Sequence, residues 1–137
     1  MCVCYSSIPH SFNLPVEARL LSDVTVRLIT DQERQRHDQL MEEEHYLGNS
    51  NAIGQVLRYV AEHKGQWVGA LTFCSSSLHL KPRDRLLGWD ADMVRERRHL
   101  IAQNSRFLIL PSTGHWPNLA SKILKLVCQR LYDDWLN

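Results

Sequence analysis

The fold is decided by residues 104–135, NSRFLILPSTGHWPNLASKILKLVCQRLYDDW, where an apolar run passes through a short polar turn into a long periodic segment. The run at 105–110 has the length and composition of a buried strand. Beyond the turn, apolar residues recur every four positions and predict an amphipathic helix whose stripe packs into the core: Leu119, Ile123, Val127, Leu131 and Trp135. A strand that leads into a helix N-terminus commonly presents backbone N–H groups to an anionic ligand.

The residues before this stretch predict the rest of an α+β domain. Alternating apolar and polar residues, enriched in β-branched side chains, favour three strands: 24–29, 55–61 and 66–75. The turn at 63–65 joins the last two as an antiparallel hairpin. Thr30 and Glu33 have the spacing of a capping box, so a polar helix of about 31–45 should follow the first strand.

Another helix is expected just before the last strand. Asp90 is a good N-cap for a helix over 91–103, and the charged segment 82–89 ahead of it is predicted to be an irregular connection. Residues 1–23 are interrupted by Ser and Pro without sustained periodicity, so we expect an irregular N-terminal segment there and a single domain at 24–137.

The composition excludes some classes of function. The chain has 137 residues and a net charge of +1, which gives no global attraction to nucleic acid or to an anionic membrane. Local basic clusters at 81–85 and 95–98 are mixed with acidic residues. No apolar run approaches the roughly 18 to 20 residues that span a bilayer, and the N-terminus lacks a signal pattern. We therefore expect a cytoplasmic protein with no membrane partner.

The cysteines do not have the spacing of a zinc ribbon or a disulfide framework. Cys74 and Cys128 stand among apolar residues, so we expect both to be buried thiols. Cys2 and Cys4, together with His10, offer soft metal ligands in principle, but their spacing is a weak signal, and we expect no metal.

Six blocks stand in order along the chain: EHYLG at 44–48, GQVLRY at 54–59, RDRLLGW at 83–89, NSRFLILP at 104–111, NLAS at 118–121 and DW at 134–135. In this order they resemble successive blocks of the DruA family. That family is the Druantia anti-phage component, which is also encountered beside or fused to transposases. The resemblance covers residues 24–135.

The resemblance implies a fold similar to that of the Gcn5-related N-acetyltransferases. We expect part of that fold, a mixed antiparallel sheet with flanking helices and an extra helix before the fourth strand. The family pattern continues past residue 135 into a further strand and block, so we expect a C-terminally truncated member whose C-terminal half is missing. The edge of the 105–110 strand is then uncovered, which predicts self-association.

The same resemblance allows an acyl-coenzyme A site at the turn after the last strand. Gly114, Asn118 and Ser121 are the candidate contacts, because backbone amides there would face the pyrophosphate. The turn nevertheless has one glycine and a bulky His115-Trp-Pro117, where acetyltransferases usually have two glycines or a glycine and an alanine. No cofactor is therefore firmly implied.

Other polar residues are candidates for catalysis or for contacts. Glu44 and His45 could supply a general base, although His45 at a helix C-terminus is also a good partner for the helix dipole. Contacts to nucleic acid or to a partner protein are expected from five residues: Arg83, Arg85, Trp89, Arg97 and Arg98. The alternative for Arg83 is an internal pair with Asp84 that fixes the loop, and Arg106 is expected to pin a loop end.

Two functions remain open. The first is a protein of anti-phage defence or of a mobile element, which contacts DNA and other defence or transposition proteins and is not a complete enzyme. The second is an acyl-coenzyme A-dependent N-acyltransferase. The irregular turn and the missing C-terminal part favour the first.

Overall fold

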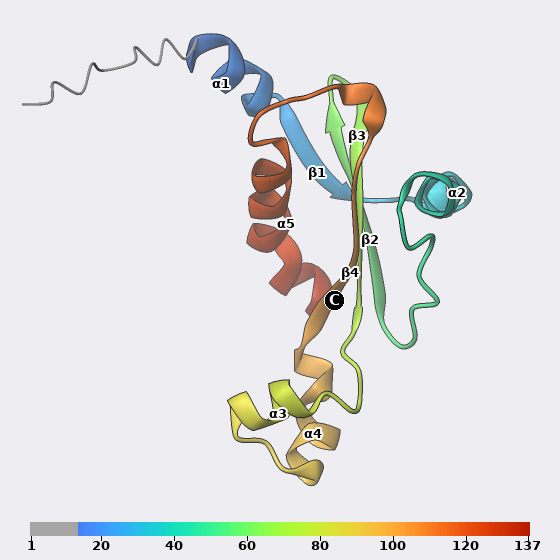
Figure 1. The fold of residues 1–137 in the computed structure, drawn as a ribbon, viewed down its shortest axis with the longest axis vertical. Helices are drawn as coiled ribbons and strands as arrows, with labels where there is room; N and C mark the ends of the chain where they lie inside the picture. Colours follow the sequence, from blue (N-terminus) through green and yellow to red (C-terminus); the bar gives the residue numbers. More distant parts are fainter. Residues whose placement is uncertain (1–13) are drawn as a thin grey trace, which may run out of the picture.

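The computed structural model describes residues 14–137 and is built around one four-stranded antiparallel sheet (Figure 1). Each strand pairs with its neighbour in the sequence, in the order β1 (Val24–Leu28), β2 (Val56–His63), β3 (Gln66–Ser75) and β4 (Ala102–Ile109). His63 pairs with Gln66, so Lys64 and Gly65 form the predicted two-residue hairpin turn. The predicted α+β class is therefore confirmed, and all three strand pairings are antiparallel.

Helices lie on both faces and at one end of this sheet. In chain order they are α1 (Leu14–Ser22), the 3-10 turn η1 (Asp31–Glu33), α2 (Arg34–Glu44), α3 (Lys81–Leu87), α4 (Ala91–Arg97), η2 (Arg98–Leu100), η3 (Pro111–Thr113) and α5 (Leu119–Leu136). Figure 1 shows α5 and α2 on opposite sides of the sheet, with α3 and α4 together beyond one end of it. Within residues 14–137, no helix combines the length and the apolar composition that crossing a bilayer requires.

The larger core lies between the sheet and α5. The predicted stripe is buried there through Leu119, Ile123 and Val127, and the half-buried Leu131 packs against the same core. Trp135, at the end of the stripe, is buried outside this cluster. On the sheet side the buried partners are Val24, Tyr59, Ala61, Val68, Leu71 and Phe73. The 3.6-residue period of α5 therefore matches one face of the sheet, as the sequence predicted.

A smaller core lies on the opposite face, beneath α2. Met41 of α2 is fully buried and packs with five residues of the sheet and its C-terminal extension: Val60, Trp67, Ala70, Leu108 and Leu110. His37 is also fully buried, and its Nε2 lies 3.3 Å from the Leu71 carbonyl oxygen. Burial lowers the pKa of His37. Two buried side chains are thus enough to anchor an otherwise polar helix.

A close approach of three elements occurs at Gly69 in β3. A Cβ atom at this position would lie 3.0 Å from the Leu108 carbonyl oxygen and 3.1 Å from Ile123 Cδ1. Such distances are shorter than ordinary van der Waals contact, so a larger residue would push α5 or β4 away.

Polar bonds fix the C-terminal end of α5 against the sheet. The Tyr59 hydroxyl donates to the Asp134 carboxylate at 2.8 Å, and the Trp135 indole donates to the His99 carbonyl at 2.7 Å. Arg130 pairs with Asp134 at 2.6 Å and donates to the Val26 carbonyl at 2.9 Å. The hydrogen bond from Arg130 lowers the pKa of Asp134, so this carboxylate stays ionised.

Several predicted boundaries are wrong, each for an identifiable reason. Residues 14–22 form a helix where we expected an irregular segment, because Leu21 packs on the larger core and Pro15 is tolerated in a first helical turn. Residues 81–87 form α3 with Pro82 at its start and Gly88 as its C-cap, a pair of signals that the charged composition concealed. Residues 1–13 lie outside the described part.

The predicted helix at 91–103 ends at Arg97. Pairing of β4 with β3 extends to Gln103 and Ala102, opposite Cys74 and Ser75. Because β3 is ten residues long, residues 102 and 103 pair with its C-terminal end, and the hydrogen bonds of the sheet override the helix propensity of this segment. Cys74 is buried as predicted, whereas Cys128 is exposed, because it lies just outside the stripe of α5 that faces the sheet.

We expect Ile123→Ala to lower the free energy of unfolding by about 3 kcal/mol, because it leaves a cavity at a fully buried position. The matched control is Leu124→Ala on the same helix, where the side chain is 40% exposed and the cost should stay below about 1 kcal/mol. Urea denaturation measures both values. Equal losses for the two variants would contradict the packing of α5 described above.

Glu33 generates a prediction about pH. Its carboxylate accepts two 2.7 Å hydrogen bonds from Arg27, which also pairs with Glu62, and one of 2.9 Å from the Thr30 backbone N–H. The bonds from Arg27 are the main cause of a pKa lowered from 4.5 to about 2. The ionised form therefore stabilises the fold above pH 4.5, and this contribution disappears as the pH falls towards 2.

Glu33→Gln should therefore lower the melting temperature at pH 7, with a stability loss of about 1 kcal/mol. The difference from the wild type should shrink between pH 4.5 and about 2. Calorimetric melts across this range test it, with Glu44→Gln at an exposed position of α2, the helix that follows Glu33, as the control. A difference that does not change with pH would refute the assignment to this ion pair.

Candidate functional site

Positive charge gathers at one end of the molecule. Residues 81–106 carry seven Lys and Arg against four Asp and Glu, a net charge of +3 where the whole chain has +1. They form α3, α4, η2 and β4 up to Arg106. We call α3, α4 and η2 (residues 81–100) the α3–α4 end; it lies beyond the sheet in Figure 1.

Arg83 is held inside the α3–α4 end. Its side chain is 12% exposed and pairs with Asp84 at 2.5 Å. The same guanidinium donates to the Ser77 carbonyl at 2.8 Å and to the Ser76 hydroxyl. These bonds join α3 to the segment that follows β3. They match the alternative that the sequence left open for Arg83, an internal pair with Asp84 that fixes the loop.

Trp89 is half-buried at the same end, and its backbone N–H donates to the Asp84 carbonyl at 2.9 Å. It lines a small cavity of about 260 Å³ with Asp90, Val94 and Arg95. The Asp90 side chain accepts from the Met93 N–H at 2.8 Å and so caps α4, as predicted. Trp89 is therefore half-buried beside the start of α4 instead of standing free in solvent.

The remaining three arginines have available charges. Arg85 and Arg97 are exposed, and Arg98 is half-buried. Across residues 14–137, none of their guanidinium groups takes part in an ion pair or hydrogen bond, whereas the neighbouring Arg95 pairs with Asp92 at 3.2 Å. Because they are not neutralised, these three groups can bind an external anion.

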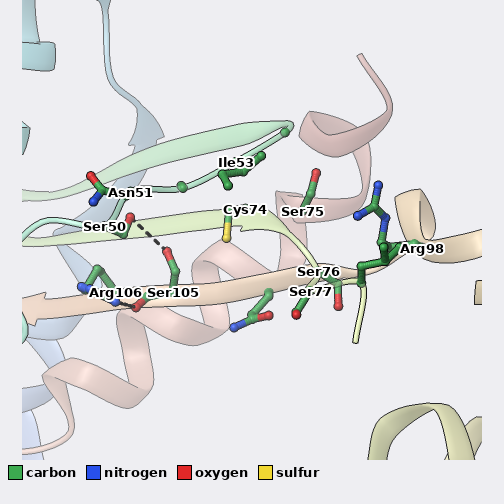
Figure 2. A pocket seen from close by; sticks show the side chains of 14 residues that line it. Ser50, Asn51, Ile53, Cys74, Ser75, Ser76, Ser77, Arg98, Ser105 and Arg106 are labelled. Atoms are coloured by element: carbon green, nitrogen blue, oxygen red, sulfur yellow. Dashed lines mark hydrogen bonds between the residues drawn. The ribbon is translucent and has the colours of Figure 1, made fainter. Parts of the chain in front are cut away.

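A polar cavity of about 560 Å³ adjoins the α3–α4 end. It lies between the loop at 50–54, the C-terminal end of β3 and the start of β4 (Figure 2). Five serines line it: Ser50, Ser75, Ser76, Ser77 and Ser105. We call it the serine cavity. Arg98 stands at one end of it and Arg106 at the other, and among residues 14–137 no carboxylate lines it.

Arg106 pins the loop that forms one wall of the serine cavity. It donates to the Gly48 carbonyl at 2.8 Å and to the Ser105 carbonyl at 2.7 Å, with longer contacts to the carbonyls of Leu47 and Asn49. The predicted role of Arg106 in fixing a loop end is confirmed. Its bonds go to carbonyl oxygens, so its charge is not neutralised by a carboxylate.

The cavity as a whole was not predicted from the sequence. Ser50 and Asn51, Ser75 and Gln103 are far apart in the chain and meet only through the sheet register. The one signal available was the alternation of Gly and polar residues at 48–54, which indicated a loop but not its partner.

Glu44 and His45, the catalytic candidates, lie at the end of α2. Glu44 is exposed, and His45 stacks on the exposed ring of Tyr46 with centroids 4.8 Å apart. The Leu47 N–H donates to His45 Nδ1 at 3.2 Å, which leaves the ring proton on Nε2 in the neutral form. Desolvation, helped by the charge of Arg106, lowers the pKa of His45. Neither residue lines the serine cavity.

The cofactor candidates occupy the opposite end of β4. Gly114 follows η3, Asn118 is the N-cap of α5, and Ser121 is exposed in the first turn of that helix. Trp116 packs edge-on against His63 with centroids 4.9 Å apart, which fills part of the turn. The serine cavity is lined by β4 as far as Arg106, so residues 107–110 separate it from this turn.

The described part of the chain brings together no group of three His, Cys, Asp or Glu side chains that could hold a metal ion. The cysteines considered for that role, Cys2 and Cys4, lie outside it together with His10.

These features define an α+β protein with a covered antiparallel sheet, an unneutralised basic end and a polar cavity beside it. The family model described as Druantia protein DruA matches residues 15–137, so the chain belongs to the DruA family. This membership associates it with anti-phage defence. No curated protein and no solved structure matches the chain, so the likeness to Gcn5-related acetyltransferases stays a prediction.

The two arginines of α3 should differ in their effect on stability. We expect Arg83→Ala to cost about 2 kcal/mol, because it leaves Asp84 and Ser76 without their partner. Arg85→Ala at an exposed position should change stability by less than about 0.5 kcal/mol. Urea denaturation of both variants tests this. A larger loss for Arg85→Ala would show that the α3–α4 end is held differently.

Proposed function

We propose that this chain acts in anti-phage defence by contacting nucleic acid through the α3–α4 end. The observation that carries the proposal is a set of three guanidinium groups that have no partner within residues 14–137, those of Arg85, Arg97 and Arg98, in a segment (81–100) of net charge +2. Such groups bind phosphates and release counterions, which gives salt-dependent affinity without base recognition. Arg83 and Trp89 are left out of the contact surface because internal packing engages them.

The contact role is proposed without a chemical step on the nucleic acid. The catalytic candidates Glu44 and His45 do not line the serine cavity, and the cofactor candidates lie at the far end of β4. A contacting component of this kind would act together with other defence proteins, and the same surface would serve in a mobile element. The rigid attachment of α3 to β3 by Arg83 supports a fixed surface for such contacts.

We expect the double variant Arg85→Gln/Arg97→Gln to bind a labelled 20-base-pair DNA at least tenfold more weakly than the wild type. The plot of log affinity against log salt should lose about 0.9 of slope for each phosphate contact removed. Fluorescence anisotropy between 50 and 200 mM salt measures both quantities. The charge-matched control is Lys64→Gln/Lys125→Gln, whose exposed lysines lie in the β2–β3 turn and on α5.

Equal weakening by the two double variants would attribute binding to net charge alone. If the wild type does not bind DNA at 50 mM salt, the proposal is overturned.

A further inference from the structure

The serine cavity has the composition of a binding site for an anion that also carries hydrogen-bonding groups. Its two charged side chains are both arginines, and its neutral polar groups are five hydroxyls and the amides of Asn51 and Gln103. Two arginines with hydroxyl and amide groups around them, and no carboxylate among the described lining residues, favour a phosphate oxygen over a neutral or cationic ligand. A potential of one sign in a recess also raises the local concentration of anions.

The two arginines contribute differently. Arg106 is fixed by carbonyl oxygens and supplies a stationary positive charge at one end. Arg98 is half-buried at the other end, and within residues 14–137 no side chain or carbonyl bonds to its guanidinium. The N–H donors of this guanidinium are therefore available to a ligand, and a phosphate can accept from two of them in bidentate form.

The walls of the cavity are fixed before any ligand arrives. Gly54 has a φ of +84°, and a Cβ atom there would lie 2.6 Å from the Ser75 hydroxyl, so the loop is pressed onto the end of β3. Gln55 and Ser75 exchange backbone and side-chain bonds of 2.9 and 3.0 Å. On the other wall, a register shift at Thr72/Phe73 breaks the ladder opposite Ser105. Bulges of this kind commonly re-aim side chains beside functional sites.

The size of the cavity limits the ligand. About 560 Å³ falls within the range of small-molecule sites and accommodates one nucleotide, but not a duplex. Ile53 and Leu78 add apolar surface to the rim, and the side chain of Ile53 is 85% exposed. An exposed apolar side chain beside a cationic recess suits the face of a base or a ribose.

We infer that the serine cavity binds a nucleoside phosphate, with its phosphate on Arg98 and its sugar and base towards the serines and Ile53. This inference rests on the proposed nucleic-acid contact, and it identifies a single nucleotide as the part of the nucleic acid that the protein recognises. Two sources share the chemistry, a free nucleotide and the 5′-phosphorylated end of a single strand. A blunt duplex without an unpaired nucleotide should not enter.

Calorimetric titration of the full chain separates these sources. The probes are a nucleoside monophosphate, the matching nucleoside, inorganic phosphate, and a 5′-phosphorylated or 5′-hydroxyl six-base strand. We expect the monophosphate to bind at least tenfold more tightly than the nucleoside. If strand ends are the ligand, the phosphorylated strand should bind at least tenfold more tightly than both the 5′-hydroxyl strand and the free monophosphate.

Variants locate the binding in the cavity. Arg98→Gln should weaken monophosphate binding at least tenfold. Ser77→Trp should abolish binding, because the indole fills the cavity. The fold should tolerate this change, since the Ser77 side chain is exposed and forms no hydrogen bond in the described region. Arg95→Gln, three positions away in the sequence, exposed and outside the lining, is the matched control and should leave binding unchanged. Thermal melts confirm that each variant is folded.

Cys74 provides a second measurement that does not depend on affinity changes. Its thiol lines the serine cavity, while Cys128 is exposed on α5. Bound monophosphate should slow alkylation of Cys74, read by mass spectrometry, and leave Cys128 unaffected. The inference is overturned if the nucleoside binds as well as the monophosphate, if folded Arg98→Gln binds like the wild type, or if Cys74 is not protected at saturation.

The proposed function and this inference fail separately. Loss of DNA binding in Arg85→Gln/Arg97→Gln with intact monophosphate binding supports both. DNA binding that persists while no probe enters the cavity overturns only the nucleoside phosphate site.

Discussion

The structure depends on the burial of β3 on both of its faces. Of its ten residues, the eight from Trp67 to Cys74 are buried, and β2 and β4 pair with its two edges. Helix α5 covers one face and α2 the other, so both cores of the domain are built on this strand and its neighbours. The absence of a side chain at Gly69 lets α5 and β4 approach at the same point.

This constraint also explains where the polar features lie. Most side chains in the middle of β3 are apolar and buried, with Thr72 as a buried polar exception, so this part of the strand is closed to ligands. From the last residue of β3 the chain continues as the serine run 75–77, where the neighbouring elements are the loop at 50–54 and α3. The serine cavity is thus the first place along β3 where packing no longer excludes water and ligands.

How much the sequence could predict follows from the range of the interactions. The bounds of β3 and the core stripe of α5 follow from local periodicity, and both predictions are confirmed. The predicted C-terminal end of α4 was wrong, because the strand pairing of Gln103 with Cys74 is a nonlocal contact that helix periodicity does not reveal. The partner of Arg83 was foreseeable, since Asp84 is adjacent, whereas the meeting of Ser50 with Ser105 was not, because 55 residues separate them.

The position of α5 has a consequence for biosynthesis. All four strands precede it in the chain, yet Tyr59 and Leu71 are sealed only when α5 docks. At translation rates of 5–20 residues per second, the 18 residues of α5 take roughly 1–4 s to synthesise. Until α5 has been synthesised and has docked, this apolar face of the sheet has no helix to cover it, so it is open to a chaperone or to another chain.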